Sequence, residues 1–350
     1  MIKRLHATMT SISVTTLTLG ALVLSGCSAP STPAASSETP VVSSPPAKAI
    51  AAFDGDITNN SLAVSPDEKT AVVSDSREKS ILIYDLTDGK LRKKIEGFGT
   101  PRDIAFVNEG SEFVVSDSTL GTLRFYNTND SSFKDEVVVG PGAFGTSVSP
   151  DGKTLYVNNE AHSSVTRVDI AARRAVDVLT GFSQPRQGIQ ASPDGKQVFV
   201  TNFQGDKVTV IDVASWKIVR EISGFSKIRG ISVSPDGGTL YAANSGRNSV
   251  SVVDTATGAI SQDIAVGNDP YGASLSPDGK LLLASNKVDN TISVINASDN
   301  SVVKTIDGFK EPRQAIVFNK DQSTAYVLNK DLSIAKLNVS DLSVTQTISQ

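Results

Sequence analysis

The amino-acid sequence predicts an all-β protein made of seven repeated units, and three observations support this. First, residues 149–159 (SPDGKTLYVNN) recur in recognisable variants along most of the 350-residue chain. Second, successive copies begin 41 to 43 residues apart, and a fixed period of this size is typical of repeat architectures. Third, each period holds four short β-like runs and no run with helical periodicity. Four-stranded units repeated seven times predict a seven-bladed β-propeller with four antiparallel strands per blade. The copies begin at Ser65, Asn108, Ser149, Ser192, Ser234, Ser276 and Asn319.

The period that begins at Arg186 shows how one unit divides into strands. Its runs are rich in β-branched residues, and they end at Gly, Asn, Asp or Ser, which favour turns. We therefore expect four strands, at residues 187–191, 197–201, 207–211 and 218–222.

The polar residues between the strands are predicted to fix turns rather than to bind a ligand. In Ser-Pro-Asp-Gly, Pro presets φ, Asp bonds nearby amides and Gly accepts a positive φ. Two further Asx positions recur seven times each, and seven equivalents indicate a structural role. The positions after the second strand are Asp75, Asp117, Asn159, Asn202, Asn244, Asn286 and Asn329. The positions after the third strand are Asp85, Asn127, Asp169, Asp212, Asp254, Asn296 and Asn338.

The repeat resembles the YVTN-type β-propeller repeat family. The resemblance lies in SPDG-x-x-x-Tyr-Val-x-Asn, then SVxVIDxxT, then a Pro-x-Gly-Ile segment, and it covers roughly residues 49–350. The copies at Asn108 and Asn319 depart most, since they lack Ser-Pro and Pro-Asp-Gly respectively. The resemblance implies the fold and leaves the function open, because the family includes surface-layer proteins, DNA-binding periplasmic proteins and domains of redox enzymes.

Residues 1–26 are expected to be a signal peptide. Lys3 and Arg4 form a positive n-region, and residues 17–24 form an apolar run too short to span a membrane. Residues 24–27 (LSGC) resemble the bacterial lipobox, which implies cleavage before Cys27 and a lipid on its sulfur. Cys27 is the only cysteine, so an intramolecular disulfide is excluded. The expected location is extracytoplasmic, anchored to a bacterial membrane.

Residues 27–48 are expected to form a tether, because after Cys27 they are mostly Ser, Pro, Ala and Thr with almost no charge. The propeller is expected over residues 49–350. Two segments match the fourth strand of a blade, residues 48–54 (KAIAAFD) and residues 343–348 (SVTQTI). The sequence leaves open which of them completes the last blade.

The charge of the mature chain argues against general nucleic-acid binding. Loss of Lys3 and Arg4 leaves 31 basic against 37 acidic residues, a net charge of −6. A nucleic-acid-binding surface is instead basic.

One mouth of the central channel is the candidate ligand-binding site. The beginnings of the inner strands line this mouth, and aligning the copies there gathers four Arg and two aromatic residues, while the first copy supplies only Asn59 or Asn60. Arg presents a planar fork to carboxylate or phosphate, and aromatic rings stack on flat groups. The predicted ligand-binding residues are Arg102, Phe144, Arg186, Arg229, Tyr271 and Arg313.

The same arginines have a second interpretation, in which they pair with acidic residues of neighbouring loops or remain solvated at the rim. The acidic candidates are Asp75, Asp103, Asp117 and Glu160. Both interpretations stay open.

Catalytic and cofactor-binding patterns are scarce. His162 is the only histidine after cleavage and is expected to be a solvated loop residue. One His and a lipidated Cys do not make a metal cluster, and no loop has calcium-ligand spacing. The single Trp216 argues against a pyrroloquinoline-quinone propeller, whose relatives carry Trp docking motifs. We therefore expect no metal and no cofactor.

These observations predict an extracytoplasmic, lipid-anchored propeller that acts as a non-catalytic binding or interaction module. Its partner is expected to be an anionic small molecule or an envelope protein or polymer. Two alternatives remain. The first is a lactonase-like hydrolase, since lactonase-type propellers resemble this fold. The second is a structural component of the cell envelope. The oligomeric state is left open.

Overall fold

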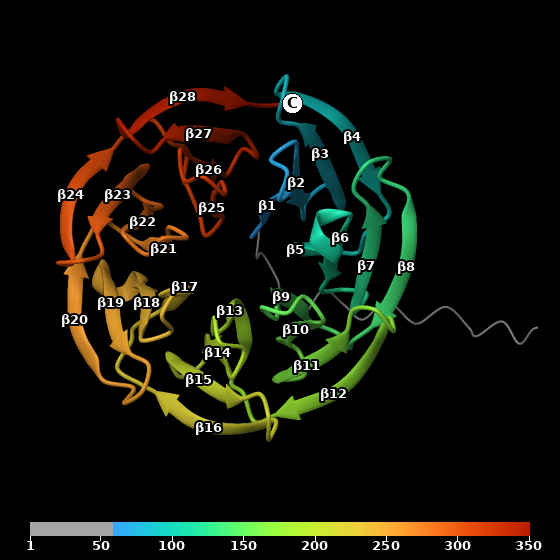
Figure 1. Ribbon diagram of the computed structural model, residues 1–350, viewed down its shortest axis with the longest axis horizontal. Coiled ribbons are helices and arrows are strands. Elements are labelled where there is room, and N and C mark those ends of the chain that lie inside the picture. Colours follow the sequence, from blue (N-terminus) through green and yellow to red (C-terminus); the bar gives the residue numbers. More distant parts are fainter. Residues whose placement is uncertain (1–58) are drawn as a thin grey trace, which may run out of the picture. The chain divides into compact units, whose positions relative to one another are not determined.

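The described part of the chain is a seven-bladed propeller. The computed structural model describes residues 59–350, so the expected signal peptide, Cys27 and the tether lie outside the described residues. The described residues belong to one compact unit, Lys48–Gln350. They form seven antiparallel sheets of four consecutive strands each, placed around a central axis (Figure 1). The predicted all-β, seven-bladed fold is confirmed.

In every blade the chain runs from the innermost strand to the outermost one (Figure 1). The innermost strands are β1 (Leu62–Val64), β5 (Pro101–Val107), β9 (Ala143–Val148), β13 (Pro185–Ala191), β17 (Ile228–Val233), β21 (Pro270–Leu275) and β25 (Ile316–Phe318). The second strands are β2 (Thr70–Asp75), β6 (Glu112–Asp117), β10 (Thr154–Asn159), β14 (Gln197–Asn202), β18 (Thr239–Asn244), β22 (Leu281–Asn286) and β26 (Thr324–Leu328). The third strands are β3 (Ser80–Asp85), β7 (Thr122–Asn127), β11 (Ser164–Asp169), β15 (Lys207–Asp212), β19 (Ser249–Asp254), β23 (Thr291–Asn296) and β27 (Ile334–Asn338).

The outermost strands form the rim of the ring. They are β4 (Lys90–Glu96), β8 (Phe133–Val138), β12 (Arg174–Thr180), β16 (Lys217–Ile222), β20 (Ile260–Ala265), β24 (Ser301–Ile306) and β28 (Ser343–Ile348). Two short 3-10 helices lie in loops, η1 (Asn108–Gly110) and η2 (Ser245–Arg247). Within the described residues, no helix is long and apolar enough to span a membrane.

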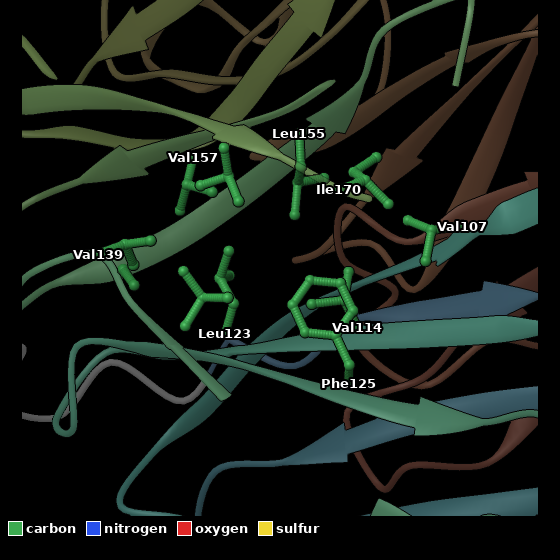
Figure 2. Packing of buried hydrophobic residues seen from close by; sticks show 11 residues of the cluster. Val107, Val114, Leu123, Phe125, Val139, Leu155, Val157 and Ile170 are labelled. Atoms are coloured by element: carbon green, nitrogen blue, oxygen red, sulfur yellow. The ribbon is translucent and has the colours of Figure 1, made fainter. Parts of the chain in front are cut away.

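Apolar side chains packed between neighbouring blades hold the ring together. Between the second and third blades, Phe125 of β7 faces Leu155 of β10 within a cluster of fully buried residues (Figure 2). Because removal of apolar surface from water is the main favourable term in folding, each such interface stabilises both of its blades. The residues labelled in Figure 2 are Val107, Val114, Leu123, Phe125, Val139, Leu155, Val157 and Ile170.

The last blade meets the first through the same kind of contact. Residues 343–348 form β28, the fourth strand of the last blade, and residues 48–54 lie outside the described residues. Of the two segments that match a fourth strand, the C-terminal one therefore completes this blade. Ile348 of β28 is 3% exposed and belongs to one cluster with Leu62 and Tyr84 of the first blade. This cluster closes the ring.

The Ser-Pro-Asp-Gly turns lie on one face of the propeller. In the third blade, the Ser149 hydroxyl donates to Asp151 Oδ1 over 2.6 Å. Turns of successive blades touch one another: Gly195 faces Pro150 across a blade boundary, and Lys320 N donates to Glu68 Oε1 over 3.0 Å between the last blade and the first. Because the strands are antiparallel, the loops after the second strands lie on the opposite face.

The predicted turn capping is confirmed at every Asx position after the third strands and at five of the seven after the second strands. Asn159 and Asn286 instead donate from their amide nitrogens to neighbouring side chains, and their Oδ1 atoms make no hydrogen bond with residues 59–350. All seven Asx residues after the third strands accept backbone N–H bonds from the turns that follow them. After the second strands the bonds reach the preceding loop as well. Asn202 Oδ1 accepts from Ser183 N over 2.8 Å, and its amide nitrogen donates to the Thr209 hydroxyl over 2.9 Å. These side chains are engaged in the scaffold.

Candidate ligand-binding site at the channel mouth

The six residues predicted at the mouth lie at the beginnings of the inner strands of six consecutive blades. Cation–π contacts connect them in two groups, with Arg102 and Phe144 in one and the remaining four in the other. We call these six residues, together with Asn59, Glu160 and Phe203, the mouth cluster.

Arginine and aromatic side chains alternate through the fourth to seventh blades. The Arg186 guanidinium carbon lies 3.8 Å from the centre of the Phe203 ring, and that of Arg229 lies 5.1 Å from the same centre. Arg229 also lies 5.0 Å from the Tyr271 ring centre, and Arg313 lies 5.8 Å from it. At these distances the ring faces attract the cations. The aromatic rings therefore allow neighbouring arginines to gather in spite of their mutual repulsion.

Arg102 is the most deeply buried arginine of the mouth cluster. It is 3% exposed, and its guanidinium carbon lies 4.9 Å from the Phe144 ring centre. Its Nε donates to the Ser118 hydroxyl over 3.1 Å. Burial lowers the pKa of Arg102 to about 10, with the opposing attraction of Glu160 and the repulsion of Arg186 as smaller causes. Arg102 therefore remains a cation at neutral pH.

Arg186 forms an ion pair with a buried carboxylate. Its Nε lies 3.1 Å from Glu160 Oε1, and the two side chains are 13% and 3% exposed. Burial raises the pKa of Glu160, against the attraction of Arg186 and Arg102. Burial also lowers the pKa of Arg186, and Glu160 opposes this change. The pairing interpretation is thus confirmed for Arg186 and Glu160.

The other acidic candidates have different positions. Asp75 and Asp117 accept backbone N–H bonds from the loops that follow them, and Asp117 also accepts from Gly99 and Thr100 in the preceding loop. Asp103 lies further along the channel, where it accepts hydrogen bonds from the Ser61 hydroxyl at 2.6 Å and from the Thr146 hydroxyl at 2.8 Å. Burial raises the pKa of Asp103, and these hydrogen bonds oppose the rise. Asp103 therefore links the inner strands of three blades.

Asn59 joins three blades at the mouth. Its Oδ1 accepts from Arg313 Nη1 over 2.9 Å and from the Tyr271 hydroxyl over 3.1 Å. Its backbone oxygen accepts from Arg102 Nη1 over 3.3 Å. Asn59 is 7% exposed. One uncharged residue thus places two oxygens among donors of the second, sixth and seventh blades.

A cavity of about 160 Å³ extends from the mouth into the channel. Asn59, Arg102 and Phe144 line it together with Asp103 and inner-strand residues of the seventh blade. Elsewhere the inner strands approach closely. A Cβ at Gly272 would lie 2.8 Å from the backbone oxygen of Gln314, so only glycine fits there. This cavity therefore offers room for a small ligand beside the mouth cluster.

Buried polar atoms of the mouth cluster include a donor and an acceptor with unused hydrogen-bonding capacity. Arg229 Nε and Glu160 Oε2 are buried and make no hydrogen bond with residues 59–350. A buried polar atom without a partner costs free energy that a bonded ligand would recover. The mouth cluster thus offers both a donor and an acceptor.

Phe203 was not predicted as a mouth residue. It is the residue directly after Asn202, and Ser118, Glu160 and Lys287 hold the same position in other blades. Ser118 bonds Arg102, Glu160 pairs with Arg186, and the Lys287 ammonium lies 5.6 Å from the Tyr271 ring centre. Aligning the copies one residue beyond the Asx position would have found this second tier.

The remaining candidates have structural or solvated positions. His162 is exposed in a loop, as expected. Trp216 packs between blades, with its ring centre 5.9 Å from that of Tyr156 and 4.8 Å from the Arg167 guanidinium carbon. Among residues 59–350, no group of three or more His, Cys, Asp or Glu side chains is arranged to hold a metal ion.

These features define a seven-bladed propeller with an arginine- and aromatic-lined mouth. A sequence model of the YNCE-like beta-propeller family matches residues 128–236 and 225–344, which is more than half of the chain. The chain therefore belongs to the YNCE-like beta-propeller family. No curated protein matches the sequence.

Comparison with solved structures supports the fold and shows nothing about the function. The chain is similar to Kuenenia stuttgartiensis hydrazine synthase, with a TM-score of 0.73 and 19% sequence identity. The match covers 81% of this chain and 95% of that chain. In total 1779 chains of solved structures match. A fold shared this widely does not specify an activity.

Proposed function

We propose that this protein is an extracytoplasmic, lipid-anchored propeller that binds an anionic ligand at its mouth without transforming it. The observation that carries the proposal is the convergence of four arginines on one opening of a protein with net negative charge. Positive charge focused in a concave site raises the local concentration of anions. The YVTN-type resemblance of the repeats fits an extracytoplasmic binding module.

The arrangement of the arginines favours a ligand with carboxylate or phosphate groups. Arg229 makes cation–π contacts with two rings, those of Phe203 and Tyr271, and these contacts restrict its guanidinium before any ligand arrives. Its buried Nε has no partner among residues 59–350. A preorganised guanidinium loses little freedom when it forms a charged hydrogen bond.

The experiment is isothermal titration calorimetry with a library of carboxylates and phosphates. It compares wild type with Arg229→Ala/Arg313→Ala, because Arg186 is already paired with Glu160. Two charged hydrogen bonds at about 1.5 kcal/mol each correspond to roughly a hundredfold loss of affinity. A matched double variant, Arg167→Ala/Arg174→Ala, removes two arginines from the outer strands of the third blade. It should bind as wild type does. Equal binding by both double variants would place the ligand elsewhere.

Membrane anchoring is the second part of the proposal. It is supported by the sequence LSGC at residues 24–27, behind an apolar run. Cys27→Ser should abolish incorporation of labelled lipid and leave the precursor uncleaved. Ser37→Ala in the tether is the matched control. Lipid incorporation that persists in Cys27→Ser would end this part of the proposal.

A lactonase-like hydrolase is the alternative function. It is favoured by one observation, a carboxylate with a raised pKa, Asp103, beside the cavity. A general base of this kind suits ester hydrolysis. Turnover in a lactone panel that is lost in Asp103→Asn would support the alternative, and a lack of turnover by wild type would count against it. A structural envelope component would show neither turnover nor small-ligand binding.

A further inference from the structure

We infer that Asn59 occupies the mouth as a built-in substitute for the ligand, and that the ligand it stands in for is a short dicarboxylate. The inference deepens the proposed function and rests on it. It concerns which chemical class binds and which contact that class must displace.

The first step is the geometry around Asn59. Two oxygens of one residue receive three hydrogen bonds from three blades. Tyr271 and Arg313 donate to Oδ1, and Arg102 donates to the backbone oxygen. Two acceptor groups a few bonds apart, each facing a guanidinium, are what a short dicarboxylate presents. A monocarboxylate or a phosphate has a single acidic centre and serves one of these positions.

The second step is that Asn59 is out of place in the repeat. In the other six blades the mouth position, which falls at Asn59 or Asn60 in the first blade, is an Arg or an aromatic residue. In the first blade the inner strand β1 has three residues and begins only at Leu62, whereas β5 and β13 have seven. Asn60 turns the other way, and its Oδ1 accepts from Ser76 N over 2.9 Å within its own blade. Of these two asparagines, Asn59 is the one that hydrogen-bonds the arginines.

The third step is the strength of the acceptor. An amide oxygen is neutral, and hydrogen bonds between a cation and a carboxylate are roughly twice as strong as neutral ones. A carboxylate at the same place would therefore outcompete Asn59. The buried Nε of Arg229, next to Tyr271, provides a further donor for it.

The fourth step is size. The cavity of about 160 Å³ is small, since pockets for drug-sized ligands span about 300–1,000 Å³. Displacement of the Asn59 side chain, which lines this cavity, enlarges it at the mouth end. Asp103 lines the deeper part, so a second carboxylate is repelled from there and stays among the arginines. The small cavity therefore favours a short chain such as that of succinate.

The test titrates succinate into wild type, Asn59→Ala and Asn59→Asp, with acetate and inorganic phosphate as comparison ligands. Loss of the competing amide in Asn59→Ala should tighten succinate binding about tenfold. Asn59→Asp places a carboxylate permanently at the mouth. It should raise the melting temperature without ligand and weaken succinate binding at least about tenfold. Asn129, exposed in the turn between β7 and β8, gives the matched controls Asn129→Ala and Asn129→Asp, which should change neither quantity.

The outcomes separate this inference from the proposed function. Succinate that binds wild type, but with an affinity unchanged in both folded Asn59 variants, overturns the inference and leaves anion binding standing. Acetate or phosphate binding as tightly as succinate overturns the dicarboxylate class. If no anion binds wild type or either Asn59 variant, the proposed function itself fails. Asn59→Ala is not usable if its melting temperature falls well below that of wild type. In that case Asn59→Asp is the deciding variant: a raised melting temperature together with lost succinate binding supports the inference, and unchanged binding overturns it.

Discussion

Glu160 Oε1 and Arg186 Nε lie 3.1 Å apart across the boundary between the third and fourth blades. Both side chains are largely removed from water, yet the pair is not symmetric. Burial raises the pKa of Glu160 in spite of two neighbouring arginines. Folding thus shifts the protonation equilibrium of Glu160 toward its protonated form. The positive charge of Arg186 partly offsets the cost of burying the ionised form.

This asymmetry predicts unequal costs for breaking the pair. Arg186→Ala leaves a buried carboxylate without its partner and should reduce the free energy of unfolding by about 3 kcal/mol at pH 7. Glu160→Gln mimics the protonated form and should cost less than about 1 kcal/mol. Urea denaturation of both variants measures the difference. Equal costs would contradict the asymmetry.

The raised pKa of Glu160 also fixes the sign of a pH dependence. A group whose pKa is raised on folding contributes stability below its ordinary pKa, 4.5 for Glu, and loses it as pH rises through the raised value. The deficit of Arg186→Ala relative to wild type should therefore shrink as pH falls toward 4.5. A deficit that stays constant over this range would show that the lost stacking on Phe203, rather than the charge, is responsible.

The aspartates of the Ser-Pro-Asp-Gly turns should give stability a pH dependence of opposite sign to that of Glu160. The Ser149 hydroxyl, followed by the Lys153 backbone N–H, lowers the pKa of Asp151 below its ordinary value of 3.8. A lowered pKa contributes stability above pH 3.8 that is lost as pH falls through the folded value. Asp151→Asn should therefore be less stable than wild type at pH 7, and the difference should be smaller at a pH below 3.8. Denaturant unfolding at both pH values measures this. If the stability difference between Asp151→Asn and wild type does not change with pH, it arises from packing and not from the charge of Asp151.

Phe203 should stabilise the mouth through two arginines. Phe203→Leu keeps most of the apolar volume and removes the ring face that attracts Arg186 and Arg229. At roughly 0.5–1 kcal/mol for each contact, the loss should be about 1–2 kcal/mol. Phe133→Leu, on an outer strand with 57% exposure, is the matched control and should change stability little. If Phe203→Leu and Phe133→Leu change the free energy of unfolding equally little, Phe203 does not stabilise the mouth.

Ring closure should depend on the end of the chain. Ile348→Ala removes a side chain that is 3% exposed between the last and first blades, and it should cost about 3 kcal/mol. Val303→Ala, on β24 with 54% exposure, should stay within about 0.5 kcal/mol of wild type. If Ile348→Ala is equally mild, the ring is closed by something other than this cluster.

The sequence alone was sufficient for the blade count, the four strands of each blade and the turn-capping residues after the third strands, because these features repeat seven times. It also placed the arginines at one mouth, since equivalent positions of a repeat occupy equivalent places around the axis. The periodicity of the sequence predicts only those structural features that the seven copies have in common.

The sequence could not predict contacts that occur at one place in the propeller and do not recur from blade to blade. Phe203 stands at a loop position where other copies have small or charged residues, so no pattern marked it. Asn59 bonds Tyr271 and Arg313, more than 200 residues away, from the segment before β1, which is one of two inner strands of three residues. The choice of strand for the last blade likewise depended on packing of Ile348 against the first blade. Such contacts are set by three-dimensional packing and not by local propensity.

The central claim is that the mouth cluster binds a small anion, and the most direct measurement is crystallographic. Crystals of wild-type propeller would be soaked with bromosuccinate, and bromine would be located by its anomalous scattering. The account predicts a bromine peak at the mouth, between Arg102 and Arg313, with the Asn59 side chain turned away from Tyr271. No peak at the mouth, with Asn59 still bonded to Tyr271 and Arg313, would contradict it.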